Sequence, residues 1–315
     1  MKSVGKNKKF KCGWIALMGP ANAGKSTLLN AFMGQKVTIV TPKAQTTRTQ
    51  IVGIYTDKFT QMIFMDTPGL SQVRGRLGKT MHQAVWQSFR QSDVILVVLD
   101  ANLYIKHPEF LDRDVSPVAD AIVNDDRPLC IAVNKVDMFR DKAKLLPLLT
   151  RIHEIWPTAE IFPISALLKD GLEDLRKLIC KYLPEGNAQF PEEQISTASI
   201  RFMVSEIVRE KLFLHLRQEV PYGVAVDVEN FEENDENEEN KQTIIQAVIY
   251  VARPMYKAMV IGKAGSMIKK IGSEARKEII ELIGGKVHLE LWVKVKEFWT
   301  EDVGFLNDLG LNQGQ

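Results

Sequence analysis

Short apolar runs alternate with amphipathic helical segments through the first 183 residues, and no other feature constrains the fold as strongly. The apolar runs cover residues 13–18, 61–69, 93–100, 128–137 and 159–166, and the helical segments include 26–34, 81–90 and 172–183. Runs that are apolar on both faces are typical of buried parallel strands. We therefore predict a doubly wound α/β domain over residues 1–183, with a mostly parallel sheet and ligands at the carboxyl ends of its strands.

A second domain follows a polar segment. Residues 184–199 are rich in proline, glycine and polar side chains, which favours a linker. From 200 to 315 the pattern is helix, strand, strand, two helices broken at Gly262 and Gly265, and a last strand. This order predicts an α+β domain in which helices back a three-stranded sheet on one side. The core positions expected on the second of these helices and on the last strand are Ile268, Ile271, Ala275, Ile279 and Leu282, and Val287, Leu289, Leu291, Val293 and Val295.

Charge is distributed unevenly along the chain. There are 41 Lys and Arg against 39 Asp and Glu, and the resulting net charge of +2 excludes a global polyelectrolyte. Residues 241–296 nevertheless hold 11 basic and 4 acidic side chains, which favours contact with a polyanion. Residues 229–239 hold seven acidic side chains and no basic one, and we expect them to form a solvated hairpin tip.

The cysteines and the hydropathy bear on the compartment. The three cysteines stand far apart and form no CxxC pair, which indicates reduced thiols and neither a disulfide framework nor a metal site. No apolar run approaches the ~18 residues that a membrane-spanning helix needs. We expect a cytoplasmic protein.

The segment GPANAGKS, residues 19–26, matches the pattern G-x-x-x-x-G-K-[ST] and lies between an apolar strand and a helix. In such a loop the glycines let backbone N–H groups converge on phosphates at the helix N-terminus. Lys25 then reaches the outer phosphates, and the Ser26 hydroxyl ligates Mg²⁺. With the required elements on both sides, the pattern predicts a phosphate-binding loop, not an ordinary glycine turn.

The segment NKVD, Asn134 to Asp137, indicates which base the site binds. It closes a buried strand, where the Asp137 carboxylate can accept hydrogen bonds from N1–H and the exocyclic amine of guanine. Adenine offers neither donor there, and a site built on such bonds rejects the analogue by on the order of 10⁴-fold. The later segment Ser165 to Leu167 suits a backbone contact to the guanine oxygen.

Two further segments fit the γ-phosphate and the metal. DTPGL places Asp66 at a strand end, where its carboxylate can hold Mg²⁺ through water, and the Gly69 N–H can bond the γ-phosphate. The polar loop KAQTTRTQ precedes that strand, and Thr47 is the candidate for a second Mg²⁺ hydroxyl, with Thr46 as its competitor. Lys25, Thr47, Asp66 and Gly69 are the predicted catalytic residues, and Ser26, Thr47 and Asp66 the predicted metal ligands.

The predicted nucleotide site comprises Gly19, Pro20, Ala21, Asn22, Ala23, Gly24, Lys25, Ser26, Thr27, Asp66, Thr67, Pro68, Gly69, Leu70, Asn134, Lys135, Val136, Asp137, Ser165, Ala166 and Leu167.

The second domain carries a G-x-x-G segment between two helices, at Gly262 to Gly265. Without side chains at its ends, such a loop lets backbone approach a sugar–phosphate chain closely. The expected core stripe of the following helix leaves Lys269 and Lys270 off the sheet. A structural turn on a solvated basic face is the alternative. The predicted RNA-binding residues are Gly262, Lys263, Ala264, Gly265, Lys269 and Lys270.

Taken in order, these motifs make the first half similar to the translation-factor-like class of small GTPases. With KAQTTR, RFMVSEIVREKL, MVIGKAGSMIKKIG and VHLELWVKVK, nearly the whole chain resembles the Era family. The resemblance implies a P-loop GTPase domain followed by a type II KH domain, with GTP or GDP and Mg²⁺ as ligands. It implies binding near the 3′ end of small-subunit ribosomal RNA and a role in assembly of that subunit. It also implies peripheral contact with the inner membrane face, which nothing in the composition requires; we expect a monomer.

The residues around the γ-phosphate predict slow turnover. In signalling GTPases a glutamine after D-x-x-G orients the attacking water, whereas this chain has Leu70, which cannot hydrogen-bond. Arg48 is nearby in sequence, but no arginine finger can be assigned. Related GTPases with an apolar residue here use K⁺ held by the loop asparagine, so the resemblance implies that Asn22 has this role.

Three functions remain open from the sequence. The first is a GTP-hydrolysing switch whose RNA binding depends on the nucleotide. The second is an RNA-binding assembly factor in which nucleotide is structural and turnover is negligible. The third is a membrane-associated signalling GTPase.

Overall fold

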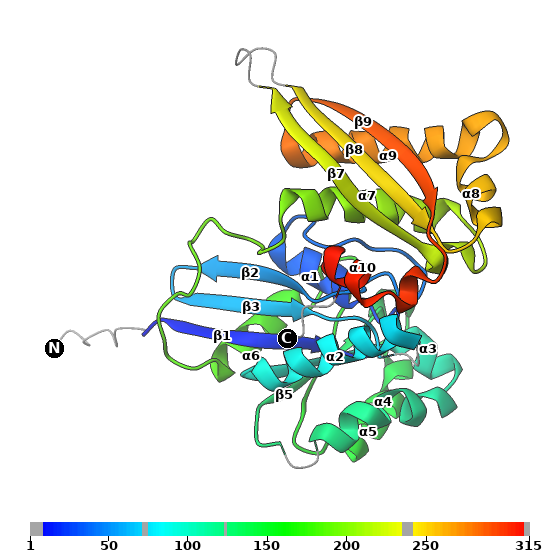
Figure 1. Ribbon diagram of the computed structural model, residues 1–315. Coiled ribbons are helices and arrows are strands. Elements are labelled where there is room, and N and C mark those ends of the chain that lie inside the picture. The colour runs from blue at the N-terminus through cyan, green and yellow to red at the C-terminus, as the bar shows by residue number, and fades with distance from the viewer. Residues whose placement is uncertain (1–8, 71–74, 123–124, 235–241, 312–315) are drawn as a thin grey trace. The chain divides into compact units, whose positions relative to one another are not determined.

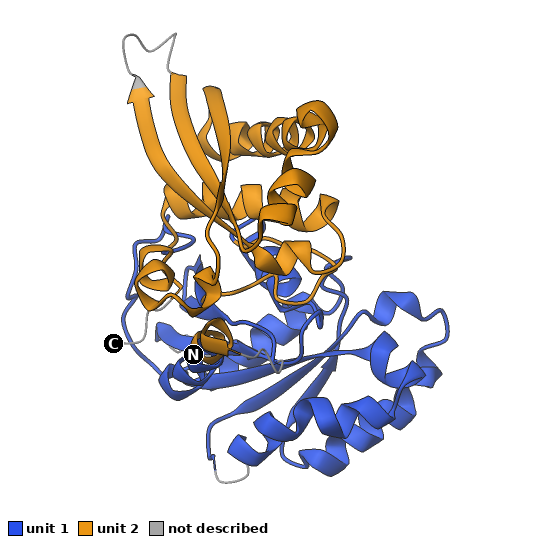
Figure 2. Cartoon of the chain, turned by 45° about the vertical axis from the view of Figure 1, so that its right-hand side comes forward, with its two compact units in different colours: residues 1–37, 50–71, 82–197 blue, residues 38–49, 72–81, 198–315 orange. Residues whose placement is uncertain are grey.

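The computed structural model describes residues 9–70, 75–122, 125–234 and 242–311. The chain divides into two compact units (Figure 2), which are described one at a time below. Unit 1 comprises residues 1–37, 50–71 and 82–197, and unit 2 comprises 38–49, 72–81 and 198–315. The break after residue 197 falls within the expected linker. Segments 38–49 and 72–81, which sequence order assigned to the first domain, cluster with unit 2.

Unit 1 is built on a six-stranded sheet in the order β2-β3-β1-β4-β5-β6, of which Figure 1 shows β2, β3 and β1 side by side. All neighbouring pairs are parallel except β2 and β3, which are antiparallel. The predicted doubly wound, mostly parallel sheet is therefore confirmed. The strands are β1 (Lys11–Met18), β2 (Ile51–Asp57), β3 (Thr60–Asp66), β4 (Val94–Asp100), β5 (Leu129–Asn134) and β6 (Glu160–Pro163).

Apolar side chains cover both faces of this sheet. In β4, Ile95, Val97 and Leu99 belong to one core cluster, and Val94, Leu96 and Val98 belong to the other. Such burial on both faces explains why the central strands β4 and β5 are apolar at every position but the last. The helices associated with the sheet are α1 (Lys25–Met33), α2 (Gly75–Gln91), α3 (Ala101–Lys106), α4 (Glu109–Ile122), α5 (Leu146–Ile155) and α6 (Leu172–Tyr182); the first seven residues of α2 cluster with unit 2.

The expected linker is in contact with unit 1 over much of its length. The Ile54 N–H donates to the carbonyl of Ile195 at 2.8 Å, and the Ser196 hydroxyl donates to the carbonyl of Val52 at 2.7 Å. Ser199 then accepts a hydrogen bond from the N–H of Phe202 at 3.2 Å and caps the next helix, as its position before an apolar helix favours.

Unit 2 contains a three-stranded sheet in the order β7-β8-β9. Strand β7 is antiparallel to β8, which is parallel to β9, and α7, α8 and α9 contribute to the core that covers one face (Figure 1). The chain order α-β-β-α-α-β of the predicted type II KH domain is confirmed. The elements are α7 (Ile200–His215), β7 (Val224–Asn234), β8 (Gln242–Val251), α8 (Pro254–Ile261), α9 (Ser266–Ile283), β9 (Lys286–Val295) and α10 (Val303–Asp308).

Most of the core positions predicted for this unit are right. Ile271, Ala275, Ile279 and Val287 are buried, and Ile268, Leu289, Leu291 and Val293 pack against them. Leu282 and Val295 are wrong, since each is 38% exposed. On α9, Ile283 packs against the core in place of Leu282. Position 283 follows Ile279 by four residues and so lies nearer to its face of the helix.

The acidic run begins within a strand. Glu229, Glu232 and Glu233 lie in β7, so this part of the expected hairpin tip is β-strand, with a shift of register at Glu229. The rest of the run, residues 235–239, lies outside the described residues. Among the described residues no helix is long and apolar enough to span a membrane.

Candidate functional site

The loop after β1 has the backbone of a phosphate-binding loop. Gly19 and Gly24 have φ of 131° and 98°, which favour glycine, and Asn22 also has a positive φ of 62°. A Cβ on Gly19 would lie 2.3 Å from the carbonyl oxygen of Val98, and one on Gly24 would lie 2.2 Å from the Asn134 side-chain nitrogen. Both positions therefore need glycine for two reasons: neighbouring atoms leave no room for a Cβ, and the backbone has a positive φ.

Lys25 holds a buried charge at this loop. Its side chain is only 6% exposed, and the Nζ donates to the carbonyl oxygens of Gly19 and Pro20, each at 2.9 Å. Burial lowers the pKa of Lys25 to about 8, although the nearby Asp66 carboxylate opposes this shift. A buried ammonium of this kind is stabilised by an incoming anion, as expected for a residue that binds phosphate.

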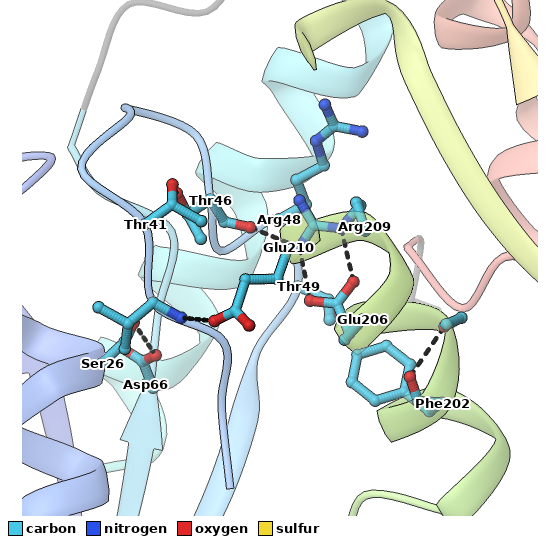
Figure 3. A network of polar contacts seen from close by, with 12 residues as sticks. Ser26, Thr41, Thr46, Arg48, Thr49, Asp66, Phe202, Glu206, Arg209 and Glu210 are labelled. Carbon is cyan, nitrogen blue, oxygen red and sulfur yellow. Dashed lines mark hydrogen bonds and ion pairs between the residues drawn. The ribbon is translucent and has the colours of Figure 1, made fainter. Parts of the chain in front are cut away.

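Ser26 and Asp66 supply adjacent oxygen atoms. The Ser26 Oγ donates to Oδ2 of Asp66 at 2.6 Å, and Asp66 is fully buried at the end of β3 (Figure 3). A hydroxyl beside a buried carboxylate is a hard donor set of the kind that Mg²⁺ takes. Ser26 and Asp66, the two predicted metal ligands in unit 1, therefore fit Mg²⁺.

The segment after β3 is held against the phosphate-binding loop. The Thr67 hydroxyl donates to the carbonyl of Leu17 at 2.7 Å, and the N–H of Leu70 donates to the carbonyl of Gly19 at 3.1 Å. A Cβ on Gly69 would lie 2.6 Å from the Cα of Ala21, so only glycine fits there. The Leu70 side chain packs against the core and offers no hydrogen bond, as predicted.

Asn134 connects three parts of the site. Its side-chain Nδ2 donates to the carbonyl of Ala23 at 2.9 Å, and its Oδ1 accepts from the N–H of Ala166 at 2.9 Å. The Asp137 carboxylate accepts from the Ser165 hydroxyl at 2.6 Å, and the same hydroxyl accepts from the N–H of Leu168. The two predicted base-recognition segments are thus bonded to each other and to the phosphate-binding loop.

Asp100 is a site residue that the sequence analysis missed. Its Oδ2 lies 2.5 Å from the Lys135 Nζ, which also donates to the carbonyl of Asn22 at 2.7 Å. The ion pair fixes Lys135, which has a positive φ of 68°. The only signal was the place of Asp100 at the carboxyl end of a buried strand. Among the remaining predicted positions, the Val136 side chain is buried in the core, and Leu167 is 73% exposed.

Thr46 and Thr47 belong to segment 38–49, which is part of unit 2. The Thr46 hydroxyl lies 2.6 Å from the hydroxyl of Thr41 and donates to the carbonyl of Lys43 at 2.7 Å. Thr47 is 7% exposed, and its role as a Mg²⁺ ligand stays a prediction.

Arg48 is committed to contacts within unit 2. Its guanidinium donates to the carbonyls of Val224 at 2.6 Å, Tyr222 at 3.1 Å and Pro221 at 3.2 Å. It also lies 5.4 Å from the ring centre of Phe213, and its side chain is 3% exposed. These contacts explain why Arg48 cannot be assigned as an arginine finger.

Helix α7 holds the same segment by side-chain contacts (Figure 3). Arg209 donates to the carbonyl of Thr46 and pairs with Glu206, and all three residues are at least nine-tenths buried. The N–H of Val40 donates to the Glu210 carboxylate at 2.9 Å. In addition, Lys43 donates to two carbonyls at the end of the helix. Segment 38–49 is therefore fastened to α7 at several points along its length.

The G-x-x-G segment forms the turn between α8 and α9. Gly262 has φ of 73°, and a Cβ there would lie 2.7 Å from Cβ of Met267. Gly265 has φ of 76° but open space around it. Lys263 and Ala264 between them are exposed, as are the predicted RNA-binding residues Lys269 and Lys270. The loop thus presents backbone and positive charge to solvent, as a KH loop requires.

A phosphate-binding loop, a base-recognition segment bonded to it, and a G-x-x-G turn on a three-stranded sheet define a P-loop GTPase joined to a type II KH domain. Two family models agree: a 50S ribosome-binding GTPase model matches residues 14–135, and a KH domain model matches residues 219–300.

Similar proteins narrow the class. GTPase Era of Desulfovibrio desulfuricans is 72% identical over 302 residues, which cover 96% of this chain and 97% of the relative. GTPase Era of Nitratidesulfovibrio vulgaris is 59% identical over 302 residues, which also cover 96% of this chain and 97% of the relative. Among solved structures, an Aquifex aeolicus Era variant bound to GDP·AlF4− is 37% identical with a TM-score of 0.86, over 96% of this chain and 99% of that one. The chain belongs to the Era family of GTPases.

Proposed function

We propose that this chain is a GTP-hydrolysing switch that binds small-subunit ribosomal RNA near its 3′ end and assists assembly of that subunit. The observation that carries the proposal is the joint presence of a guanine-recognition site and an exposed KH loop in one chain. A solved Era structure in complex with MgGDPNP and nucleotides 1506–1542 of 16S ribosomal RNA supports it, with 37% identity and a TM-score of 0.87 over 96% of this chain and 99% of that one.

Different residues of unit 1 bind the base and the phosphates of the nucleotide. Asp137 accepts from the guanine edge, and the hydrogen bond from Ser165 fixes the orientation of its carboxylate. Asn134 holds the base-recognition segment to the phosphate-binding loop, so base and phosphates are bound by one connected framework. Lys25 pairs with the outer phosphates, where its charge is buried and therefore interacts strongly.

Ser26 and Asp66 would hold Mg²⁺, and Thr47 would supply the further hydroxyl that depends on the γ-phosphate. When bound, the ion would neutralise charge on the β- and γ-phosphate oxygens. The hydrogen bond between Ser26 and Asp66 holds these two oxygen donors next to each other. The Gly69 N–H is then the protein group that senses the γ-phosphate.

Hydrolysis by the chain alone is slow in this proposal. The Leu70 side chain packs into the core, so it cannot orient water, and Arg48 is bound to carbonyls in unit 2. We expect an intrinsic rate below ~1 min⁻¹, because water and charge are poorly placed. We further propose that Asn22 contributes to a K⁺ site, which identical rates in Na⁺ and K⁺ buffers would disprove.

On the RNA side, the loop from Gly262 to Gly265 would clamp the sugar–phosphate backbone, with Lys263, Lys269 and Lys270 adding charge. Since ribosomal subunits are assembled in the bacterial cytoplasm, we place the protein there and expect a monomer. Peripheral contact with the inner membrane face is a separate proposal, which the measurement with phospholipid vesicles tests.

Release of phosphate from GTP tests the proposed function. We would compare the full chain alone, with the 3′ segment of small-subunit ribosomal RNA, and with anionic phospholipid vesicles. Stimulation by RNA supports the switch, and a Gly262→Asp, Gly265→Asp double variant should lose that stimulation while it keeps GDP binding. Turnover near zero in every arm would instead favour a structural nucleotide. Stimulation by vesicles alone would favour a membrane-associated GTPase.

A further inference from the structure

The sheet of unit 2 has a second face, opposite to the one that the helices cover. In β8, the side chains at 245, 247, 249 and 251 belong to the core, and those at 244, 246, 248 and 250 point the other way. The neighbours of these residues in β7 and β9 follow from the register. We call the part of this second face around Trp292 the open face. It consists of Asp227, Asn230 and Glu232 on β7, Ile244, Gln246 and Val248 on β8, and His288, Glu290 and Trp292 on β9.

One end of the second face is already covered. The ring of Tyr250 packs edge-on against that of Phe305, with 4.8 Å between the two ring centres. Ala225 lies in an apolar cluster with Trp299 and Leu306. The open face begins in the next row, where Asp227 pairs with Val248 and Val248 with Trp292. There the Trp292 side chain is 60% exposed.

An exposed tryptophan in the middle of a strand is unusual. Trp buries 150–250 Å² when it is covered, and it is among the residues most enriched at the energetic centres of interfaces. Trp292 lies on β9, which is an edge strand of the sheet. Its neighbour Val248 is only 1% exposed, so the indole stands beside a covered apolar side chain, and Ile244 on the same face is half-buried.

Carboxylates surround this apolar centre. Asp227, Glu232 and Glu290 lie on the open face, and Glu229 lies at its border, where it pairs with Lys294 at 2.8 Å. Hydrogen bonds from His288 and then Gln246 lower the pKa of Glu290, so it stays ionised. Burial raises the pKa of Asp227, and the charge of Glu229 raises it further. The open face thus holds three carboxylates and no lysine or arginine, and the lysines that lie next to it on β9 are Lys286 and Lys294.

These carboxylates disfavour RNA on the open face and favour a cationic partner. The exposed lysines Lys263, Lys269 and Lys270 belong to the turn and the helix that follow α8, and α8 and α9 pack on the other face of the sheet. A planar guanidinium stacks on an indole ring and donates two parallel hydrogen bonds to one carboxylate. A lysine ammonium stacks less well and cannot form this bidentate contact. We propose that the open face centred on Trp292 docks an arginine-rich protein segment.

The probe is a fluorescein-labelled peptide of alternating arginine and serine, measured against the full chain by anisotropy. A lysine–serine peptide of the same length is the comparison. We expect saturable one-to-one binding that weakens with salt and prefers arginine over lysine. Trp292→Ala should weaken binding at least about tenfold, as at other interface centres, while Trp292→Phe retains much of it. A double variant with Asp227→Asn and Glu290→Gln should weaken it without removing the ring.

The matched control is Phe298→Ala, since Phe298 is 77% exposed but lies beyond the end of β9. Binding of GDP and of ribosomal RNA should be the same in every variant, which excludes misfolding. Equal peptide affinity in wild type, Trp292→Ala and the double variant would overturn the proposal, as would an equal loss in Phe298→Ala. A loss of RNA affinity in Trp292→Ala would assign the face to RNA. Self-association that only Trp292→Ala abolishes, without peptide binding, would assign it to a second copy of the chain.

Discussion

Replacing Arg48 tests how firmly segment 38–49 is held to unit 2. The Arg48 guanidinium donates three hydrogen bonds to the carbonyls of Pro221, Tyr222 and Val224. Hydrogen bonds to a charged group each contribute about 1.5–3 kcal/mol net. Burial, followed by repulsion from Arg209, lowers the pKa of Arg48, as expected for a charge that is costly to bury. We take this cost as offsetting roughly half of the gain, so Arg48→Ala should reduce the free energy of local opening by about 3 kcal/mol.

Arg48→Lys provides a graded version of the same change. A lysine keeps the charge but lacks the planar fork that reaches several carbonyls, so we expect a loss of about 1–2 kcal/mol. Hydrogen exchange measured by mass spectrometry on peptides from segment 38–49 and from the start of β7 reports this free energy locally. A loss of about 3 kcal/mol corresponds to protection lowered by about a hundredfold.

The control for this series is Arg217→Ala, because Arg217 is exposed in the same unit. An exposed substitution of this kind should change protection by no more than ~0.5 kcal/mol. If these peptides exchange hydrogen at the same rate in Arg48→Ala as in Arg217→Ala, the buried guanidinium does not hold segment 38–49. The reasoning from its three carbonyl contacts is then refuted.

Three further predictions concern the binding loops. The pKa of Lys25 is about 8, below its ordinary value, so the free protein loses this charge above pH 8 and phosphate binding must then take up a proton. GDP affinity should therefore fall up to about tenfold between pH 7 and 9, and calorimetry in buffers of different ionisation enthalpy should detect proton uptake; a flat profile would contradict the shift. Asp137→Asn should lower GTP affinity and raise that for xanthosine triphosphate, which competition binding measures, and unchanged guanine preference would remove Asp137 from the base site. Gly262→Ala should weaken RNA binding more than Gly265→Ala, because only the first Cβ meets Met267; equal anisotropy titrations would contradict this.

The sequence predicted the parts of the site that local chemistry determines. The Gly19 to Ser26 loop, the buried strands and the segment Asn134 to Asp137 are recognisable because each motif follows an apolar strand. In a parallel sheet the carboxyl ends of these strands lie at one edge, so the residues meet without further information. Asp100 was missed although it obeys the same rule, because a lone carboxylate after a strand has no motif of its own.

Other features depend on contacts between distant parts of the chain. The edge strand β2, antiparallel to β3, follows a polar loop and was not identified from its seven residues. The assignment of segment 38–49 to unit 2 rests on Arg48, whose carbonyl partners lie more than 170 residues away in the sequence. No periodicity in residues 38–49 could reveal such partners.

Helix α7 shows why a charged helix face can be misread. Glu206, Arg209 and Glu210 are three and four residues apart, a spacing that is typical of a solvated face. In the structure all three are buried, since α7 packs its apolar face on the unit 2 core and these charges on segment 38–49. The segment backbone adds hydrogen bonds to this charged face, since the Thr46 carbonyl accepts from Arg209 and the N–H of Val40 donates to Glu210. Moving the backbone of segment 38–49 away from α7 would therefore break these bonds and leave buried charges without their partners.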